Sequence, residues 1–236
     1  METKAKPSKR IQTSILNGPE KKALVWMAER MPKWVNSDML TFTGSLGAFL
    51  FGLGYALTPI SIYFLWLSCA GLVINWFGDS LDGTLARVRN CQRPKYGFFI
   101  DHMMDCLNEV MMFVGCGLSV LMRLDIALIV LICYLLLTVY VFTSAHLKGE
   151  FKLTYAKVGP TEFRIVILIA TLMLLYITPL REFSHVFNIF GTEVTASLLD
   201  IISITIAAIL FIMYIISIIR DAREYAREEP LTHNDS

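Results

Sequence analysis

Four aspartates in the middle of the sequence have the spacing expected of a metal site. Asp79 and Asp82 are three residues apart and Asp101 and Asp105 are four residues apart, so each pair would share one face of a helix. Converging carboxylates would repel one another strongly unless cations bound between them. Oxygen ligands favour hard ions such as Mg²⁺, Mn²⁺ or Ca²⁺, and metals held in this way suit phosphoryl transfer. The pattern therefore predicts a pair of divalent ions; the alternative is that the four carboxylates are simply solvated at helix ends.

The rest of the sequence consists mainly of long apolar runs. The chain is 55% hydrophobic and 17% charged, whereas soluble domains are about 45–50% apolar and about 25% charged. This composition excludes a soluble globular enzyme, a disordered chain and a nucleic-acid binder with a basic surface. A helix needs about 20 apolar residues to cross a bilayer, which predicts an all-α integral membrane protein with six spans. The predicted spans are 39–57, 60–78, 98–122, 126–147, 163–180 and 195–219.

The basic residues predict the orientation of these spans. All of the 21 Lys and Arg residues except Arg123 and Arg181 lie before the first span, between spans two and three, between span four and the start of span five, or in the tail. Positively charged segments stay on the cytoplasmic side of a membrane. We therefore expect a multi-pass protein with both termini in the cytoplasm. The aspartates would lie on the cytoplasmic side.

Three segments are expected along the chain. Residues 1–37 would form a cytoplasmic segment with a juxtamembrane helix, residues 38–220 the six-helix membrane domain, and residues 221–236 a charged cytoplasmic tail. Within residues 19–31, apolar side chains share one helical face, which favours an amphipathic helix in the membrane interface over a soluble linker helix. The start of the chain has no pattern of a removable signal peptide.

The residues around the aspartates resemble the signature of the CDP-alcohol phosphotransferases. The matching positions are Asp79, Asp82, Gly83, Ala86, Arg87, Gly97, Asp101 and Asp105. One departure is that nine residues separate Arg87 from Gly97, where the family usually has eight. The resemblance implies a phospholipid-synthesising transferase. Such enzymes move a substituted phosphate from a CDP-linked alcohol to a second alcohol and release CMP.

The resemblance also implies a role for each aspartate. Asp79, Asp82 and Asp101 would hold Mg²⁺ or Mn²⁺, and Asp105 would help to bind the second ion or act as the general base. The cytidine nucleotide would find room at three small residues, which are Gly83, Ala86 and Gly97.

Three further residues are expected near the nucleotide. Arg87 would lie close to its phosphates or to the acidic cluster. Thr41 fits a family pattern at the start of span one, where Asp38 replaces the usual Asn. Both side chains are therefore predicted contacts of the nucleotide.

Four residues bear on the acceptor alcohol. His102 directly follows Asp101, as in the choline/ethanolamine phosphotransferase branch, and is a candidate base because histidine exchanges protons near neutral pH. Glu162 belongs to a Gly-Pro-x-Glu pattern that the same branch carries, and could bind a cationic headgroup. Arg164 could bind a phosphate, and Glu109 is a further candidate. The alternatives are that His102 only packs, that the start of span five is an ordinary helix cap, and that Glu109 makes a hydrogen bond between spans.

Other interpretations stay open at this point. The donor could be CDP-diacylglycerol with a small polar acceptor such as inositol phosphate or glycerol phosphate, so that the lipid tails come from the donor. A divalent-cation transporter would also use buried carboxylates, although it would not need the accompanying Gly, Ala and Arg. The resemblance implies a homodimer, and the small residues of span one would permit close helix packing. Substrate and membrane lipids, not nucleic acids, are the expected partners.

Overall fold

The computed structural model describes residues 17–148, 159–189 and 191–229, and nearly all of its elements are helices. In chain order they are α1 (Asn17–Arg30), α2 (Ser37–Ala56), η1 (Ile62–Phe64), α3 (Leu65–Val88), α4 (Pro94–Gly117), α5 (Leu124–Lys148), α6 (Pro160–Tyr176), α7 (Thr178–Arg181), β1 (Ser184–Ile189), β2 (Thr192–Ser197) and α8 (Leu198–Glu228).

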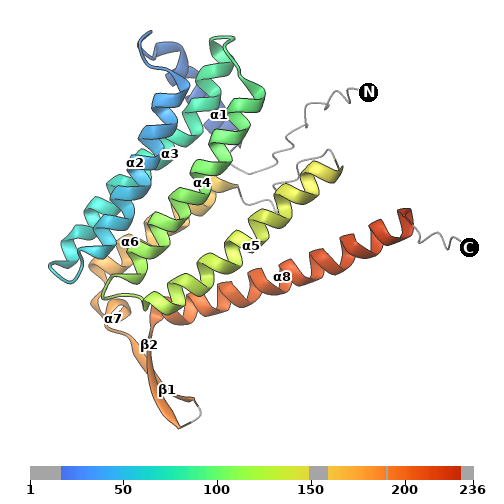
Figure 1. The fold of residues 1–236 in the computed structure, drawn as a ribbon. Coiled ribbons are helices and arrows are strands. Elements are labelled where there is room, and N and C mark those ends of the chain that lie inside the picture. Colours follow the sequence, from blue (N-terminus) through green and yellow to red (C-terminus); the bar gives the residue numbers. More distant parts are fainter. Residues whose placement is uncertain (1–16, 149–158, 190, 230–236) are drawn as a thin grey trace, which may run out of the picture.

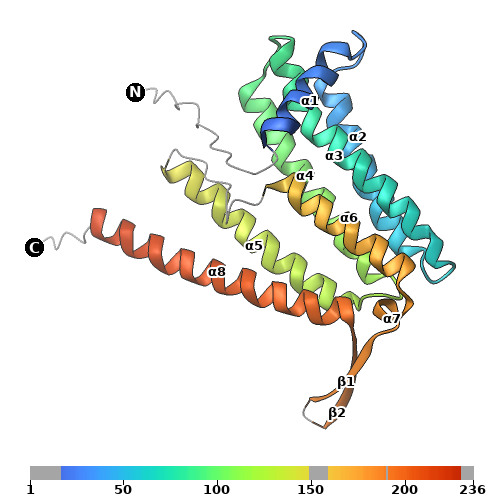
Figure 2. The same cartoon turned by 180° about the vertical axis from the view of Figure 1, so that it is seen from behind.

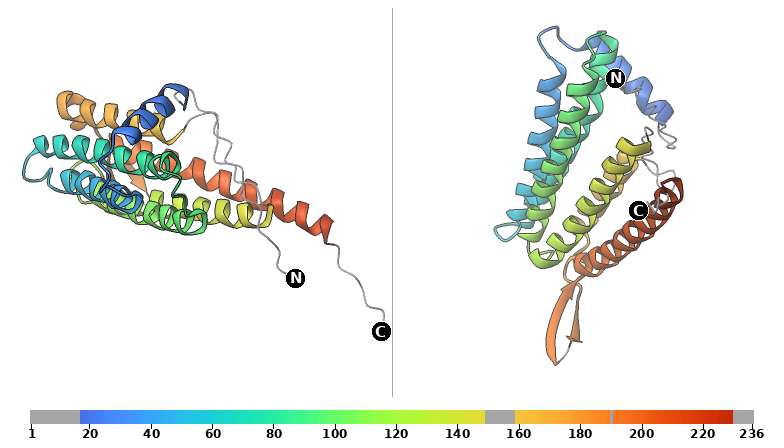
Figure 3. Two further views of the ribbon diagram at one scale, coloured as in Figure 1. Left: turned by 90° about the horizontal axis from the view of Figure 1, so that it is seen from above. Right: turned by 45° about the vertical axis from the view of Figure 1, so that its right-hand side comes forward.

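The long helices run up and down in turn and form two groups. Helices α2, α3 and α4 pack side by side, with α6 against α3 (Figure 1). Helices α5 and α8 form a pair, and α5 also contacts α4. From behind, α1 is seen lying across the end of α3 (Figure 2). Two further views show that α8 runs beside α5 and away from α2 and α3 (Figure 3).

Among the described residues, four helices are long and apolar enough to cross a membrane. They are Ser37–Ala56, Ile62–Val88, Leu124–Ala145 and Leu198–Glu228. The other two predicted spans are present as α4 and α6. Helix α4 carries three acidic residues and α6 has 17 residues. Six membrane spans and cytoplasmic termini therefore stay predictions. Several of the Lys and Arg residues that predict the orientation lie outside the described residues.

Glycines bring the backbones of α2, α3 and α4 close together. A Cβ added at Gly78 of α3 would collide with the backbone at Gly44 of α2, and one at Gly47 would collide with the backbone at Asn75. On another side of α2, Gly52 meets Gly115 of α4. The small residues of α2 thus serve packing within one chain, and the homodimer gains no support from them.

Helix α1 packs on the protein through its apolar residues. Leu24 and Ala28 are buried in a cluster with Leu81 and Leu85 of α3. Met27 and Met31 also pack against this cluster, whereas Ala23 is exposed. The apolar face predicted within residues 19–31 therefore packs on α3, apart from Ala23. An interfacial position for α1 stays a prediction.

Several helix ends differ from the predicted spans. Strands β1 and β2 pair antiparallel as a hairpin that extends from one end of the molecule (Figure 1). The last helix begins at Leu198, because the Ser197 side chain caps it through the Asp200 backbone N–H. That helix continues to Glu228, so the segment after residue 220 is helical for two further turns. Helix α4 ends at Gly117, earlier than predicted.

Candidate active site

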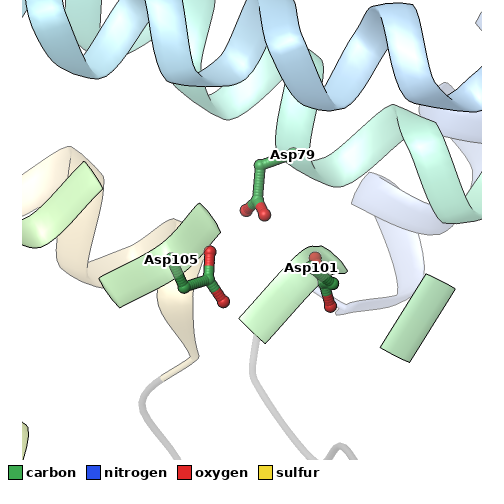
Figure 4. A group of neighbouring side chains, drawn as sticks. All are labelled: Asp79, Asp101 and Asp105. Carbon is green, nitrogen blue, oxygen red and sulfur yellow. The ribbon is translucent and has the colours of Figure 1, made fainter. Parts of the chain in front are cut away.

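Three of the four aspartates meet between α3 and α4. One carboxylate oxygen from each of Asp79, Asp101 and Asp105 lies within 4.8 Å of the other two. Figure 4 shows Asp79 reaching down from α3 toward the two aspartates of α4. So much negative charge in one place needs compensating cations. The oxygen-only donor set fits a hard divalent ion.

Close packing of α2 and α3 places Asp79 in this group. Asp79 directly follows Gly78, whose backbone lies against Gly44 of α2. A side chain at residue 78 would push the two helices apart. The shared face of Asp101 and Asp105 is then directed at α3 by the contact of α4 with α2 at Gly52 and Gly115.

Asp82 has a different environment from the three clustered aspartates. It is 9% exposed, and its carboxylate accepts a 2.7 Å hydrogen bond from the Thr41 hydroxyl of α2. Its other oxygen accepts from the backbone N–H of Gly83. Asp82 is still within electrostatic range of Asp79 and Asp101. The expectation that all four carboxylates converge therefore holds for three of them. The fourth, Asp82, is hydrogen-bonded to the Thr41 hydroxyl.

Arg164 enters the acidic cluster from α6. Its Nη2 donates to Asp79 at 2.6 Å, and its Nε donates to the Asn75 side chain at 3.0 Å. Asn75 in turn donates to the Gly44 carbonyl at 3.0 Å. The sequence predicts that Arg164 could bind a phosphate, but not that it contacts Asp79. The contact through Asn75 was not predicted, although a polar residue one turn before Asp79 in an apolar helix is a signal for it.

The beginning of α6 is held by two carboxylates. Glu162 accepts a 3.0 Å hydrogen bond from the Gly159 backbone N–H, as in a capping box. Glu20 of α1 accepts from the Thr161 hydroxyl at 2.5 Å and from the Trp76 indole at 3.1 Å. Glu162 therefore helps to begin the helix, as the ordinary interpretation of this sequence expected. The bridge by Glu20 between three helices was not predicted, because the sequence indicates only that Glu20 suits a first helical turn.

His102 is packed against two aromatic rings on the side of the cluster. Its ring centroid lies 4.1 Å from that of Phe98 and 4.9 Å from that of Phe142 in α5. Nδ1 lies 2.7 Å from the Phe98 carbonyl oxygen and 3.8 Å from a carboxylate oxygen of Asp101. A carbonyl oxygen only accepts, so Nδ1 carries the proton in this hydrogen bond. In the neutral ring the Nε2 atom then holds the lone pair.

Glu109 lies one turn beyond Asp105 on α4. The Tyr134 hydroxyl of α5 lies beside its carboxylate, and Arg164 and Asp79 are close enough to interact with it electrostatically. Glu109 is therefore adjacent to the cluster and bonded toward α5. The contact with Tyr134 agrees with the alternative that Glu109 makes a hydrogen bond between spans. Glu109 also remains close to the three clustered aspartates.

The predicted nucleotide positions lie along the end of α3 and the start of α4. A Cβ added at Gly97 would meet no atom within 4 Å, and one added at Gly83 would meet only the Arg87 guanidinium, at 3.4 Å. The Arg87 side chain donates to the Thr84 hydroxyl at 2.9 Å. Ala86 is half-buried in the last turns of α3, where its carbonyl accepts from the Cys91 N–H. Space is thus present at both glycines.

Asp38 joins α2 to the connection between α3 and α4. Its carboxylate accepts a 2.5 Å hydrogen bond from Arg93. The Arg93 guanidinium also lies 4.0 Å from the centre of the Tyr96 ring. The hydrogen bond to Asp38 raises the pKa of Arg93 above its usual range. Asp38 therefore has a protein partner in the loop that is one residue longer than is usual for the resembled family.

Comparison with known proteins assigns the family. A family model described as CDP-alcohol phosphatidyltransferase matches residues 34–213. The match spans every aspartate of the cluster and most of the described helices, whereas no curated protein matched the sequence. This family description implies a transferase that uses CDP-linked alcohols in phospholipid synthesis, and together with the four long apolar helices it indicates an integral membrane protein. The chain belongs to the CDP-alcohol phosphatidyltransferase family.

Proposed function

We propose that this protein catalyses the metal-dependent transfer of a substituted phosphate from a CDP-linked alcohol to an acceptor alcohol, with release of CMP. The observation that carries the proposal is the meeting of Asp79, Asp101 and Asp105 within 4.8 Å. These residues belong to the segment that matches the family. The proposed site faces the cytoplasm within a six-span bundle whose termini are both cytoplasmic, as the basic residues predict.

The residues present fit Mg²⁺ or Mn²⁺, and we propose two ions. Asp79, Asp101 and Asp105 supply oxygen donors from two helices. Asp82 is the further ligand that the family resemblance implies, and the Thr41 hydroxyl orients it. When bound, such ions would neutralise the carboxylates and stabilise negative charge on the phosphate oxygens of the substrate.

The nucleotide is proposed to lie at the ends of α3 and α4 that Gly83 and Gly97 leave open. The backbone at these glycines can be approached closely because no Cβ covers it. Arg87 donates a hydrogen bond to the Thr84 hydroxyl one turn earlier, which holds its guanidinium beside α3. Asp38 and Thr41 would bound the same region from the start of α2.

The acceptor hydroxyl must lose a proton, and two residues are proposed to take it. His102 holds the proton of Nδ1 against the Phe98 carbonyl, which leaves Nε2 as the basic atom of the neutral ring. Asp105 is the alternative, because its carboxylate lies in the cluster itself. Phe98 and Phe142 pack against the His102 ring and hold its orientation.

The identity of the two alcohols is the finer part of the proposal. His102 after Asp101 and the Gly-Pro-x-Glu start of α6 favour a CDP-choline or CDP-ethanolamine donor with a lipid acceptor. Arg164 beside Asp79 favours the second candidate, in which CDP-diacylglycerol donates to a small acceptor that carries a phosphate. A guanidinium in the site would bind such an anion.

CMP release by the purified protein tests these proposals. CDP-choline, CDP-ethanolamine and CDP-diacylglycerol would each be combined with diacylglycerol, inositol phosphate or glycerol phosphate, in Mg²⁺ or Mn²⁺. Thin-layer separation of the lipid products then identifies the pair that reacts. Release of CMP with any pair, abolished by a chelator, supports the reaction. Metal uptake into liposomes without CMP release from any pair would instead favour a cation transporter.

A further inference from the structure

The Arg164 guanidinium lies against the acidic cluster itself. It lies 2.6 Å from an oxygen of Asp79, and the two side chains are only 17% and 23% exposed. Its charge also acts on Asp105 and on Glu109. One protein cation therefore contacts Asp79 and lies within electrostatic range of Asp105, a second carboxylate that would bind a divalent ion.

The geometry indicates that this contact is built into the fold. Asn75 accepts a hydrogen bond from Arg164 Nε. The Asn75 side chain also donates a hydrogen bond to the Gly44 carbonyl, where α2 and α3 meet. At the other end, Thr161 ties the first turn of α6 to Glu20. Arg164 is therefore held against Asp79 by the hydrogen bond to Asn75 of α3, and its helix is held by the contact with Glu20 of α1.

We propose that Arg164 is a tethered counter-cation of the acidic cluster, which competes with a divalent ion for the Asp79 carboxylate. The inference rests on the proposed function, because it assumes that Asp79 binds a metal. An ion on the same oxygens would place two positive groups in contact, which is unfavourable where water is scarce. Metal binding is therefore expected to loosen the contact between Arg164 and Asp79. The released guanidinium would then be available to an anionic oxygen of a substrate, so that metal binding prepares substrate binding.

Mn²⁺ binding to the full chain in detergent micelles, without nucleotide, tests the competition. Electron paramagnetic resonance of free Mn²⁺ gives the dissociation constant. Arg164→Gln is expected to bind Mn²⁺ about tenfold more tightly than the unmodified protein, because the competing charge is gone. Arg164→Lys keeps the charge and should stay within about threefold. Arg123→Gln is the matched control, since Arg123 pairs with exposed Asp125 at 2.6 Å and should not alter binding.

The outcomes separate this inference from the proposed function. If Arg164→Gln binds Mn²⁺ as weakly as the unmodified protein, or more weakly, while Asp101→Asn removes binding, the competition is wrong and the metal site stands. If no binding depends on Asp101, both are wrong.

A second measurement does not depend on the folding of Arg164→Gln. Nitrogen-15 resonances of arginine side chains in the unmodified protein, assigned with Arg164→Lys, should show the Arg164 Nε–H signal move on addition of Mg²⁺. An unmoved signal at saturating Mg²⁺ would overturn the proposal.

Discussion

The Thr41 hydroxyl of α2 donates a 2.7 Å hydrogen bond to the Asp82 carboxylate of α3. One turn earlier on α2, the Ser37 hydroxyl donates to the Asp82 backbone carbonyl at 2.8 Å. Two hydroxyls of one helix thus hold one acidic residue of the next. The orientation of Asp82 therefore depends on α2 and not only on its own helix.

Replacing Thr41 tests this dependence. Thr41→Val should lower both activity and stability, because the buried Asp82 carboxylate loses a hydrogen bond worth about 1–3 kcal/mol. Thr43→Val is the matched control, since the Thr43 hydroxyl bonds to the Met39 carbonyl of its own helix. Thermal unfolding and CMP release measure the two effects. Equal behaviour of the two variants would contradict the role of Thr41.

Removing an aspartate of the cluster should abolish transfer. Asp79→Ala or Asp101→Ala leaves too few oxygen ligands for the ions, and we expect CMP release to fall by at least about a hundredfold. Asp125→Asn is the control, because Asp125 is exposed in the first turn of α5 and pairs with Arg123. Turnover of either alanine variant at the unmodified rate, in folded protein, would refute the assignment of these ligands.

Two glycines should respond differently to the same substitution. Gly78→Ala is expected to destabilise the protein by about 1–3 kcal/mol or more, since its Cβ would collide with the Gly44 backbone. Gly97→Ala meets no atom within 4 Å and should unfold like the unmodified protein. If the nucleotide lies over Gly97, this variant should raise KM for the CDP-alcohol. Unfolding temperature and KM together check both expectations, and an unchanged KM would remove Gly97 from the nucleotide site.

The role of His102 can be separated from its packing. His102→Phe keeps an aromatic ring between Phe98 and Phe142 but has no proton acceptor. If His102 is the base, kcat should fall by about 10²-fold or more with little change in KM or unfolding temperature. Steady-state CMP release measures both constants. A variant with normal kcat would assign the base to Asp105 and leave His102 a packing role.

Local patterns explain why much of the site could be predicted from the sequence. Asp101 and Asp105 lie at helical spacing, and a short connection joins their helix to the one that carries Asp79, so their convergence follows once α3 and α4 both pack on α2. The start of α6 was also predictable, because Gly159 and Pro160 form an ordinary helix beginning.

Other features depend on contacts between distant segments. Strands β1 and β2 have no strong apolar alternation in the sequence, so the apolar pattern predicts a membrane helix that begins at residue 195, inside β2. The contacts of Glu20 with α3 and α6 join residues 56 and 141 positions apart. A spacing rule within one helix carries no information about such pairs.

The sequence by itself determined which groups this protein has: long apolar segments, carboxylates at helical spacing, and a motif that resembles one family. The tertiary structure decided how the charges are shared. In the folded chain, three carboxylates accept hydrogen bonds from distant side chains: Asp82 from Thr41, Asp79 from Arg164 and Asp38 from Arg93. The physical reason is that helix periodicity sets which side chains share a face, whereas close packing at glycines sets which faces meet.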